Sequence, residues 1–544
     1  MAMGKRAVLF HRFLGVSARA GRSDTVMFGV FFGWILAWLH PYINMPFHWD
    51  AVGYVSHHTY EIYKHPLLPF VTGDFDTGHP TLVFWLAALL WRVFGVNLWA
   101  PRLLMFGFGA TLLLYTYKTG RRLGLRAAAA LVAPLTLSLT PLVASQTAQF
   151  QLDIPLTALF AASAYYQLKG NRPGRLAFFG AAMVLCKLAG VLLLIPLMAF
   201  ALMISASRNG LAGWKAHLRS QAPYVPPLAA LALFLILRRL CTGTVFAKTQ
   251  TNQVGMSFEL ESFLGKIPHF AYAFTFFNEA YLLLPFLALA LLLFWRPGRP
   301  AIPKPSADTT PAPCLCPPRI SWRHFSFLAL LVFVLYAIPN ILRTTCTPLP
   351  RYFLSYLFFL HLGIAWAVLR FWRTWKPAGA LLLLFLCTVL LFHWHPKHGN
   401  RPFLRAFRPL LQNQWVLASG RNGEETFEWV DYVYVTKRMI QRIERQYLND
   451  RVILAVYPES AELMYPYTGY VSQPRLIHAA WTPDQFRQAF NDNRASLCLF
   501  TSQSSANYDM EAMCKEMSLR FVKRYRRHNA WCALYEKPVP PKPR

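Results

Sequence analysis

The sequence predicts an α-helical polytopic membrane protein that ends in a small α/β domain. Two observations predict the membrane part: 55% of the 544 residues are hydrophobic, and they gather in blocks long enough to cross a bilayer. A hydrocarbon core of about 30 Å requires about 20 helical residues. The third observation is the C-terminal region, where short β-like runs alternate with polar helical stretches.

The apolar blocks are expected to be helices, because backbone groups in lipid must find their hydrogen-bond partners within the segment. We expect about eleven crossings within residues 26–394, one of them at residues 127–143. The first block, residues 26–42, has no small-residue cleavage site after it and is interpreted as a retained span. Residues 81–94 form a shorter apolar stretch that contains Arg92, and we expect a shallow or re-entrant helix there.

Charges in the loops predict which side of the membrane each segment faces. The formal net charge is +31, but the cations lie mostly in short loops and in the C-terminal region, without a nucleic-acid-binding motif. Nucleic acid is therefore not an expected partner. The positive-inside rule places the tail, residues 1–25, and the Pro-rich loop, residues 296–323, in the cytoplasm. The first loop, residues 43–79, is then outside, and we expect the Pro-rich loop to be disordered.

The C-terminal region, residues 395–544, is expected to form an α/β domain outside the membrane. Long domains cross the membrane largely regardless of their charge, so its basic character does not oppose this placement. We expect strands at residues 451–457, 496–501 and 531–535, and helices at 436–447 and 482–491. In an oxidising compartment Cys498, Cys514 and Cys532 could form one disulfide, whose pairing is open.

Two acidic residues lie beside predicted spans, where charged groups are functional candidates. Asp50 follows the first span, and Asp153 opens a later one with Pro155 in the first helical turn. Either could instead cap a helix N-terminus. The predicted topology places both on the outer face, where two convergent acids could share a proton, a cation or a substrate.

Two basic residues are predicted on the same outer face. Lys187 interrupts an apolar stretch at residues 176–204 and is expected to mark a helix turn at the outer surface, where an ammonium could hold a phosphate. The alternative is a snorkelling lysine. Arg351, followed by Tyr352, opens another span, and a guanidinium binds phosphate oxygens bidentately. Together these groups indicate an anionic, phosphate-bearing substrate.

Other polar residues of the first outer loop are weaker candidates. His79 begins the shallow helix on the outer face. Asp74 and Asp76 stand just before it and are interpreted as solvated loop acids. His57 and His58 could form a metal site with nearby acids, although adjacent histidines alone are weak evidence.

The order of these motifs resembles the GT-C glycosyltransferases of the dolichyl-phosphate-mannose protein mannosyltransferase type, including bacterial aminoarabinose and lipopolysaccharide-core sugar transferases. The sequence departs from the family pattern at Ala51, where the family has a second acid, and at Thr81, where it has a second proline. The first departure leaves a divalent metal open. The matching segments are Asp50 to Tyr54, His79 to Leu82, Arg102-Leu103, Leu152-Asp153, Lys187 to Gly190 with Pro196, and Pro350-Arg351-Tyr352.

The resemblance implies transfer of a hexosyl or pentosyl group from a polyprenyl-phosphate donor to a lipid, glycan or protein acceptor. Transfer would occur on the outer side of a bacterial inner membrane, with inversion and with Asp50 as the base. Lys187 and Arg351 would stabilise the departing phosphate, and Asp153 would orient the acceptor or a divalent cation. No cofactor beyond such a metal is expected, and the other substrate-binding residues implied are Tyr54, His79 and Tyr352.

Two other functions are compatible with the sequence. A transporter would place ionisable groups near the bilayer midplane, with inverted repeats, and no clear repeat is evident. A non-catalytic protein that binds lipid-linked sugars could use the aromatic residues of 458–474 for stacking, although core packing is the favoured interpretation of that segment.

Overall fold

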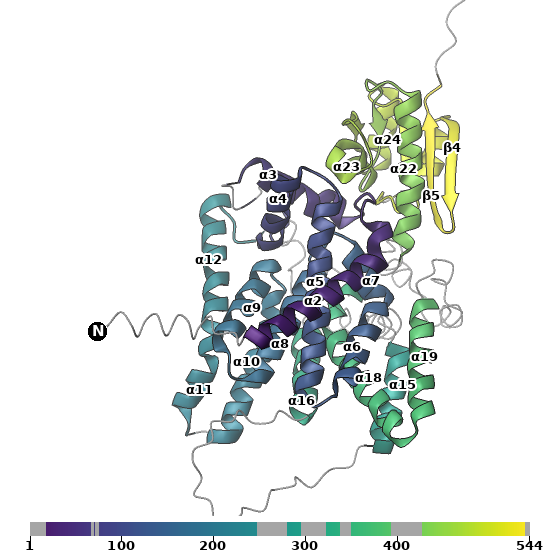
Figure 1. Ribbon diagram of the computed structural model, residues 1–544. Coiled ribbons are helices and arrows are strands. Elements are labelled where there is room, and N and C mark those ends of the chain that lie inside the picture. The colour runs from purple at the N-terminus through teal and green to yellow at the C-terminus, as the bar shows by residue number, and fades with distance from the viewer. Residues whose placement is uncertain are drawn as a thin grey trace, which may run out of the picture.

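The computed structural model describes residues 18–66, 70, 76–210, 212–246, 280–294, 322–337, 350–392, 427–506 and 508–538. These residues form a bundle of helices with a small α/β domain at one end (Figure 1). The predicted fold class is thereby confirmed. Asp74 and nearly all of the predicted Pro-rich loop lie outside the described residues.

Four of the described helical segments are long and apolar enough to cross a membrane, or five if one bent pair is counted as a single span. The total number of crossings stays a prediction. The helices of the bundle are α2 (Ala18–Leu39), α3 (Ser56–Lys64), α4 (Leu82–Phe94), α5 (Trp99–Arg122), α6 (Ala127–Leu139), α7 (Pro141–Ala148), α8 (Asp153–Lys169), α9 (Pro173–Cys186), α10 (Gly190–Asn209), α11 (Trp214–Gln221), α12 (Val225–Thr242), α15 (Ala280–Phe294), α16 (Trp322–Val332), α18 (Leu354–Thr374) and α19 (Lys376–Phe392).

The bent pair covers the span expected at residues 127–143, which is not one straight helix. Helix α6 ends at Leu139, and α7 leaves it at an angle of 66°. The cause is Pro141, which disfavours helical backbone at the preceding residue, and Thr140 is extended (φ −66°, ψ 123°). The chain therefore turns away from the α6 axis before it reaches the segment that leads to Asp153.

Helix α8 forms the centre of the bundle. Almost every residue of α8 is buried, and it packs against α5, α9, α10 and α18. Asp153 is its first residue, and the helix ends at Gly170, whose φ of +73° is easily adopted by glycine. A helix that is buried all round and begins with an acid fixes the position of that acid closely.

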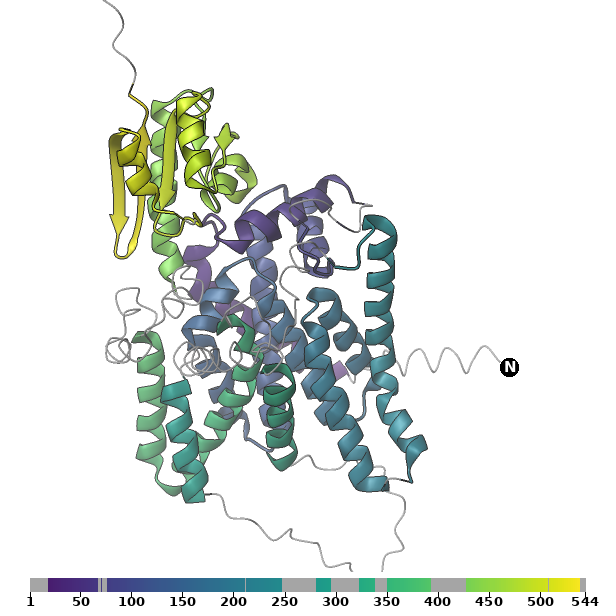
Figure 2. The same ribbon diagram turned by 180° about the vertical axis from the view of Figure 1, so that it is seen from behind.

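The C-terminal domain has a five-stranded sheet in the order β2-β1-β3-β5-β4. Strand β1 pairs in parallel with β2 and β3, and β5 pairs antiparallel with β3 and β4. Helix α22 packs against β4 and β5 (Figures 1 and 2). The elements are α22 (Glu428–Gln446), β1 (Ile453–Leu454), α23 (Glu459–Met464), β2 (Ile477–His478), α24 (Pro483–Asn491), β3 (Leu497–Thr501), α25 (Met510–Glu516), β4 (Arg520–Arg527) and β5 (Ala530–Glu536).

The predicted elements of this domain are present with shifted ends. The helix expected at 436–447 begins earlier, at Glu428, and the strand expected at 451–457 is only two residues long. The helix expected at 482–491 is present, with Thr482 and Gln485 forming a capping box. Cys498, Cys514 and Cys532 are buried free thiols, so the structure contains no disulfide between them.

Candidate active site

Four charged side chains from distant parts of the chain meet in one cluster. The Nη2 atom of Arg351 donates a hydrogen bond to Asp50 Oδ2 at 2.6 Å, and its Nε atom lies 3.7 Å from Asp153 Oδ2. Lys187 Nζ donates to Asp153 Oδ1 at 2.6 Å. The structure therefore brings together the two acids and the two cations that the sequence placed on one face.

The members of this cluster differ in exposure. The side chains of Asp153, Arg351 and Lys187 are 6%, 7% and 11% exposed, whereas that of Asp50 is 31% exposed. Two positive and two negative charges balance, which offsets much of the cost of removing them from water. Asp50 is thus the carboxylate that a bound molecule can reach.

The backbone around Asp50 has an unusual conformation. Trp49 has a φ of +47°, in the left-handed region that bulky residues avoid. Asp50 then precedes a π-helical turn, η2 (Ala51–Val55), without making a capping hydrogen bond. The capping alternative for Asp50 is therefore wrong, and its side chain is directed to Arg351.

Asp153 and Lys187 are held by helix ends. Asp153 lies in the first turn of α8, where the positive end of the helix dipole favours an acid, and its carboxylate contacts Lys187 and Arg351. Lys187 is the extended residue (φ −154°, ψ 138°) between α9 and α10, which confirms the predicted helix turn. Gly190 permits this turn, because a Cβ there would lie 2.4 Å from Met183 O. Since the ammonium bonds Asp153, the snorkelling alternative is wrong.

Arg351 and Tyr352 belong to a short turn, η6 (Pro350–Phe353), that leads into α18. The Tyr352 ring centroid lies 5.2 Å from Lys187 Nζ and 5.9 Å from the Arg351 guanidinium. Gln151, which the sequence reasoning missed, accepts from Arg351 Nη1 at 2.7 Å. The available signal was the group of glutamines at 146–151 within an otherwise apolar region.

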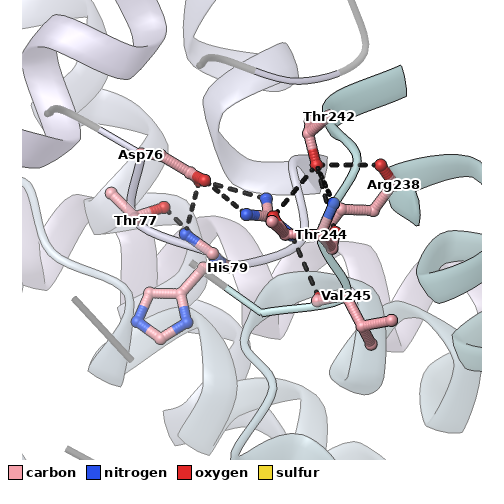
Figure 3. A network of polar contacts seen from close by, with 8 residues as sticks. Asp76, Thr77, His79, Arg238, Thr242, Thr244 and Val245 are labelled. Carbon is pink, nitrogen blue, oxygen red and sulfur yellow. Dashed lines mark hydrogen bonds and ion pairs between the residues drawn. The ribbon is translucent and has the colours of Figure 1, made fainter. Parts of the chain in front are cut away.

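His79 belongs to a separate polar network around Asp76. Asp76 is buried and forms a bidentate ion pair with Arg238 of α12, with one contact at 3.0 Å. The same carboxylate accepts from the backbone N–H of Gly78, and the imidazole of His79 points away from the ion pair (Figure 3). The prediction that Asp76 is a solvated loop acid is therefore wrong, because this carboxylate ties the loop before α4 to α12.

Tyr54 is held between the cluster and the C-terminal domain. Its ring centroid lies 5.9 Å from that of Tyr457, and burial together with the nearby Asp50 raises the pKa of Tyr54. Tyr457 also donates its hydroxyl to Trp49 O at 2.7 Å. A Cβ at Gly53 would lie 2.4 Å from the Tyr457 ring. The C-terminal domain therefore contacts the chain on both sides of Asp50, at Trp49 and at Gly53, a contact that the sequence did not predict.

His57 and His58 have separate surroundings. The Nδ1 of His57 lies 2.7 Å from the Tyr467 hydroxyl, whereas His58 stacks on Phe84 at 4.4 Å. Burial lowers the pKa of His58 to about 3. Within the described residues, no three His, Cys, Asp or Glu side chains are grouped as metal ligands.

Comparison with known proteins shows a family match over part of the chain. Residues 78–240 match the family described as dolichyl-phosphate-mannose-protein mannosyltransferase. The predicted resemblance is confirmed. The segment that matches this family contains His79, Asp153 and Lys187, while Asp50 and Arg351 lie outside it.

Two solved structures resemble the whole chain. The crystal structure of ArnT from Cupriavidus metallidurans bound to undecaprenyl phosphate is 14% identical, with a TM-score of 0.51, and the match covers 93% of this chain and 97% of ArnT. The apo structure of ArnT from the same organism is 13% identical, also with a TM-score of 0.51, over 95% and 98% of the two chains. This likeness shows a common GT-C fold. Curated proteins give no match.

Proposed function

We propose that the protein is a membrane glycosyltransferase that moves a sugar from a polyprenyl-phosphate donor to a lipid, glycan or protein acceptor. The observation that carries the proposal is the cluster of Asp50, Arg351, Asp153 and Lys187, in which one carboxylate remains accessible. The family match and the likeness to an undecaprenyl-phosphate-bound ArnT support the donor class. We place transfer, and the C-terminal domain from residue 395 onward, on the outer side of a bacterial inner membrane.

The donor phosphate would bind to Arg351 and Lys187. Both cations are engaged by carboxylates in the structure, so an incoming phosphate competes with these acids. Asp50 is the more exposed acid and contacts only one of the two cations, so it is the one that the phosphate displaces. A guanidinium suits this exchange, because its fork binds phosphate and carboxylate with similar geometry.

Displacement would leave Asp50 available as the base. The acceptor oxygen bonds to the anomeric carbon as the bond from that carbon to the phosphate oxygen breaks, and the hydroxyl proton passes to Asp50. The polyprenyl phosphate leaves with the electron pair, and its added negative charge is stabilised by Arg351 and Lys187. Direct displacement inverts the configuration of the sugar.

Asp153 would act on the two cations rather than on the acceptor. Its carboxylate is only 6% exposed and contacts both Lys187 and Arg351, which leaves it little access to a substrate. We therefore assign it to holding the two cations apart and in place, in preference to the acceptor-orienting role that the family resemblance suggested.

The proposal is tested with Asp50→Asn in the purified full-length protein, using defined polyprenyl-phosphate sugars and detection of the released polyprenyl phosphate. Removing a positioned base lowers turnover by roughly 100- to 10,000-fold. The matched control is Asp450→Asn, which removes an exposed acid of the C-terminal domain and is expected to leave turnover unchanged. Near-normal transfer by folded Asp50→Asn would exclude Asp50 as the base.

A further inference from the structure

A second polar site lies at the opposite end of α8 from Asp153. Lys169 is the last residue of α8, and the 16 intervening rises place it roughly 24 Å along the axis from Asp153. Here a pocket of about 610 Å³ opens between the end of α8, the start of α9, and helices α10, α11 and α16. The turn at residues 169–175 and the loop at residues 208–219 are basic, so the positive-inside rule predicts that this side is cytoplasmic.

The charged side chains that line the pocket are basic. Lys169, Arg208 and Arg219 come from α8, α10 and α11, and no aspartate or glutamate is among the lining residues. Neither arginine forms an ion pair within the described part of the chain, and both are exposed. Three cations converging on one pocket without an acid leave a positive charge that an anion would neutralise.

The wall of the pocket has both polar and apolar parts. Asn171 and Ser220 add groups that can donate hydrogen bonds to an anion. Leu176, Phe200 and Ile204 line the pocket as well, and the first two are buried. A ligand that suits this wall carries an anionic group next to an apolar part.

Helix α11 indicates that the pocket opens at the membrane surface. Trp214 and Leu218 are one helical turn apart and are 58% and 62% exposed. The same short helix carries Lys215 and Arg219. An exposed tryptophan and leucine beside basic residues are typical of a helix that lies in the bilayer interface, and Arg219 of this helix lines the pocket.

We propose that this pocket binds the phosphate group of an anionic lipid in the cytoplasmic leaflet. Its volume is within the range of about 300 to 1,000 Å³ that is usual for small-molecule sites. Basic pockets between membrane helices on the cytoplasmic side suit such headgroups. The site is independent of the transferase cluster, and the proposal does not rest on the proposed function.

The test measures binding of short-chain phosphatidylglycerol, phosphatidylcholine and inorganic phosphate to the full-length protein in neutral detergent, by native mass spectrometry and thermal shift. We expect phosphatidylglycerol to bind and to stabilise the protein, and phosphatidylcholine to do so much less. Arg208→Gln with Arg219→Gln should weaken phosphatidylglycerol binding by about tenfold or more, because two charge-assisted hydrogen bonds are lost.

Two control variants separate the pocket from general surface charge. Arg373→Gln with Lys376→Gln removes two exposed cations from another basic loop and is expected to leave binding unchanged. Arg208→Lys with Arg219→Lys keeps the charge and should retain most of the binding. Equal loss in the Arg373 and Lys376 variant would overturn the proposal. Inorganic phosphate that binds as tightly as phosphatidylglycerol, and is lost in the glutamine variant, would reassign the pocket to a soluble phosphate.

Discussion

At the scale of single residues, Asp50 and Asp153 have the same side chain but differ in burial, and so are suited to different roles. Both carboxylates contact Arg351, but Asp153 is only 6% exposed and also bonds Lys187. Asp50 is 31% exposed and has Arg351 as its cationic partner. Asp153 therefore contributes to the fold as well as to the site, whereas Asp50 is accessible enough to act as a base on a bound acceptor.

This difference predicts that Asp153→Asn destabilises the protein more than Asp50→Asn. Removing one partner of a buried ion pair costs about 3 to 5 kcal/mol, because the remaining charge is left without compensation. The Asp50 change should cost less, since water reaches that carboxylate. Thermal unfolding of both variants in the same detergent gives the comparison. Equal melting temperatures for the two variants would contradict the positioning role of Asp153.

The charged residues of the site could be predicted from the sequence because each interrupts an apolar environment. Lys187 within an apolar stretch and Asp153 at the start of one are conspicuous for this reason. Gln151 is less conspicuous, since a neutral amide is a smaller anomaly. Asp50 and Arg351 are 301 residues apart in the chain. Their proximity could be expected only from the predicted topology, which places both on one face, and not from the local sequence.

At the scale of elements, η2 and the C-terminal domain are in contact beside Asp50. Tyr457 precedes α23 and donates to Trp49 O, and its ring fills the space above Gly53. Helix α23 itself packs against η2. A change in this packing can therefore reach Asp50 through Trp49, its neighbour in the chain, or through Gly53, three residues further on.

We expect Gly53→Ala to lower transfer although it removes no polar group. Its Cβ would lie 2.4 Å from the Tyr457 ring, so either the ring or η2 must move. Overpacking of this kind typically costs about 1 to 3 kcal/mol. Turnover of the purified variant is the measurement, and adding Tyr457→Leu should recover part of the loss by making room.

The control is Gly29→Ala in α2, where a Cβ meets nothing within 4 Å. In that helix alanine is the better helix former, so activity and stability should be retained. Full activity of Gly53→Ala would show that the contact with Tyr457 does not affect the position of Asp50.

Elements were predictable where one apolar pattern decides the structure. The shallow helix expected at 81–94 is α4, and its ends agree to within a residue. The span expected at 127–143 is bent at Thr140, because hydropathy continues through Pro141 while the helical backbone does not. Strand β1 is shorter than its apolar run, since only two of its residues pair with neighbouring strands.

At the scale of the whole molecule, composition predicted the two parts but not how they join. The C-terminal domain reaches the bundle through aromatic residues, with Tyr42 stacked on Phe427 at 4.6 Å and Tyr60 on Tyr467 at 4.3 Å. The interpretation of segment 458–474 as core packing agrees with the structure, in which Tyr470 belongs to the core and Tyr467 packs against it. Aromatic residues give no indication of their partner in the sequence, so this interface was not predictable.

The same domain contains two buried acids that make the stability of the molecule depend on pH. Glu459 and Glu462 of α23 are fully buried, and the Tyr432 hydroxyl donates to Glu462 at 3.1 Å. Burial raises the pKa of Glu459 to about 7, and burial together with the Glu459 charge raises the pKa of Glu462 well above its ordinary value. Both acids therefore favour the protonated form in the folded protein.

A carboxyl group whose pKa is raised by folding binds protons more tightly in the folded state, so its contribution to stability falls as pH rises. For Glu459 this contribution is complete below about pH 4.5 and is lost as pH rises toward 7. We expect the melting temperature of the full-length protein to fall between pH 5 and pH 8. Glu459→Gln with Glu462→Gln should flatten this slope, because neither amide titrates. The control Glu516→Gln, which changes an exposed acid paired with Arg487, should keep the wild-type slope. An unchanged slope in the double variant would assign the pH dependence to groups outside α23.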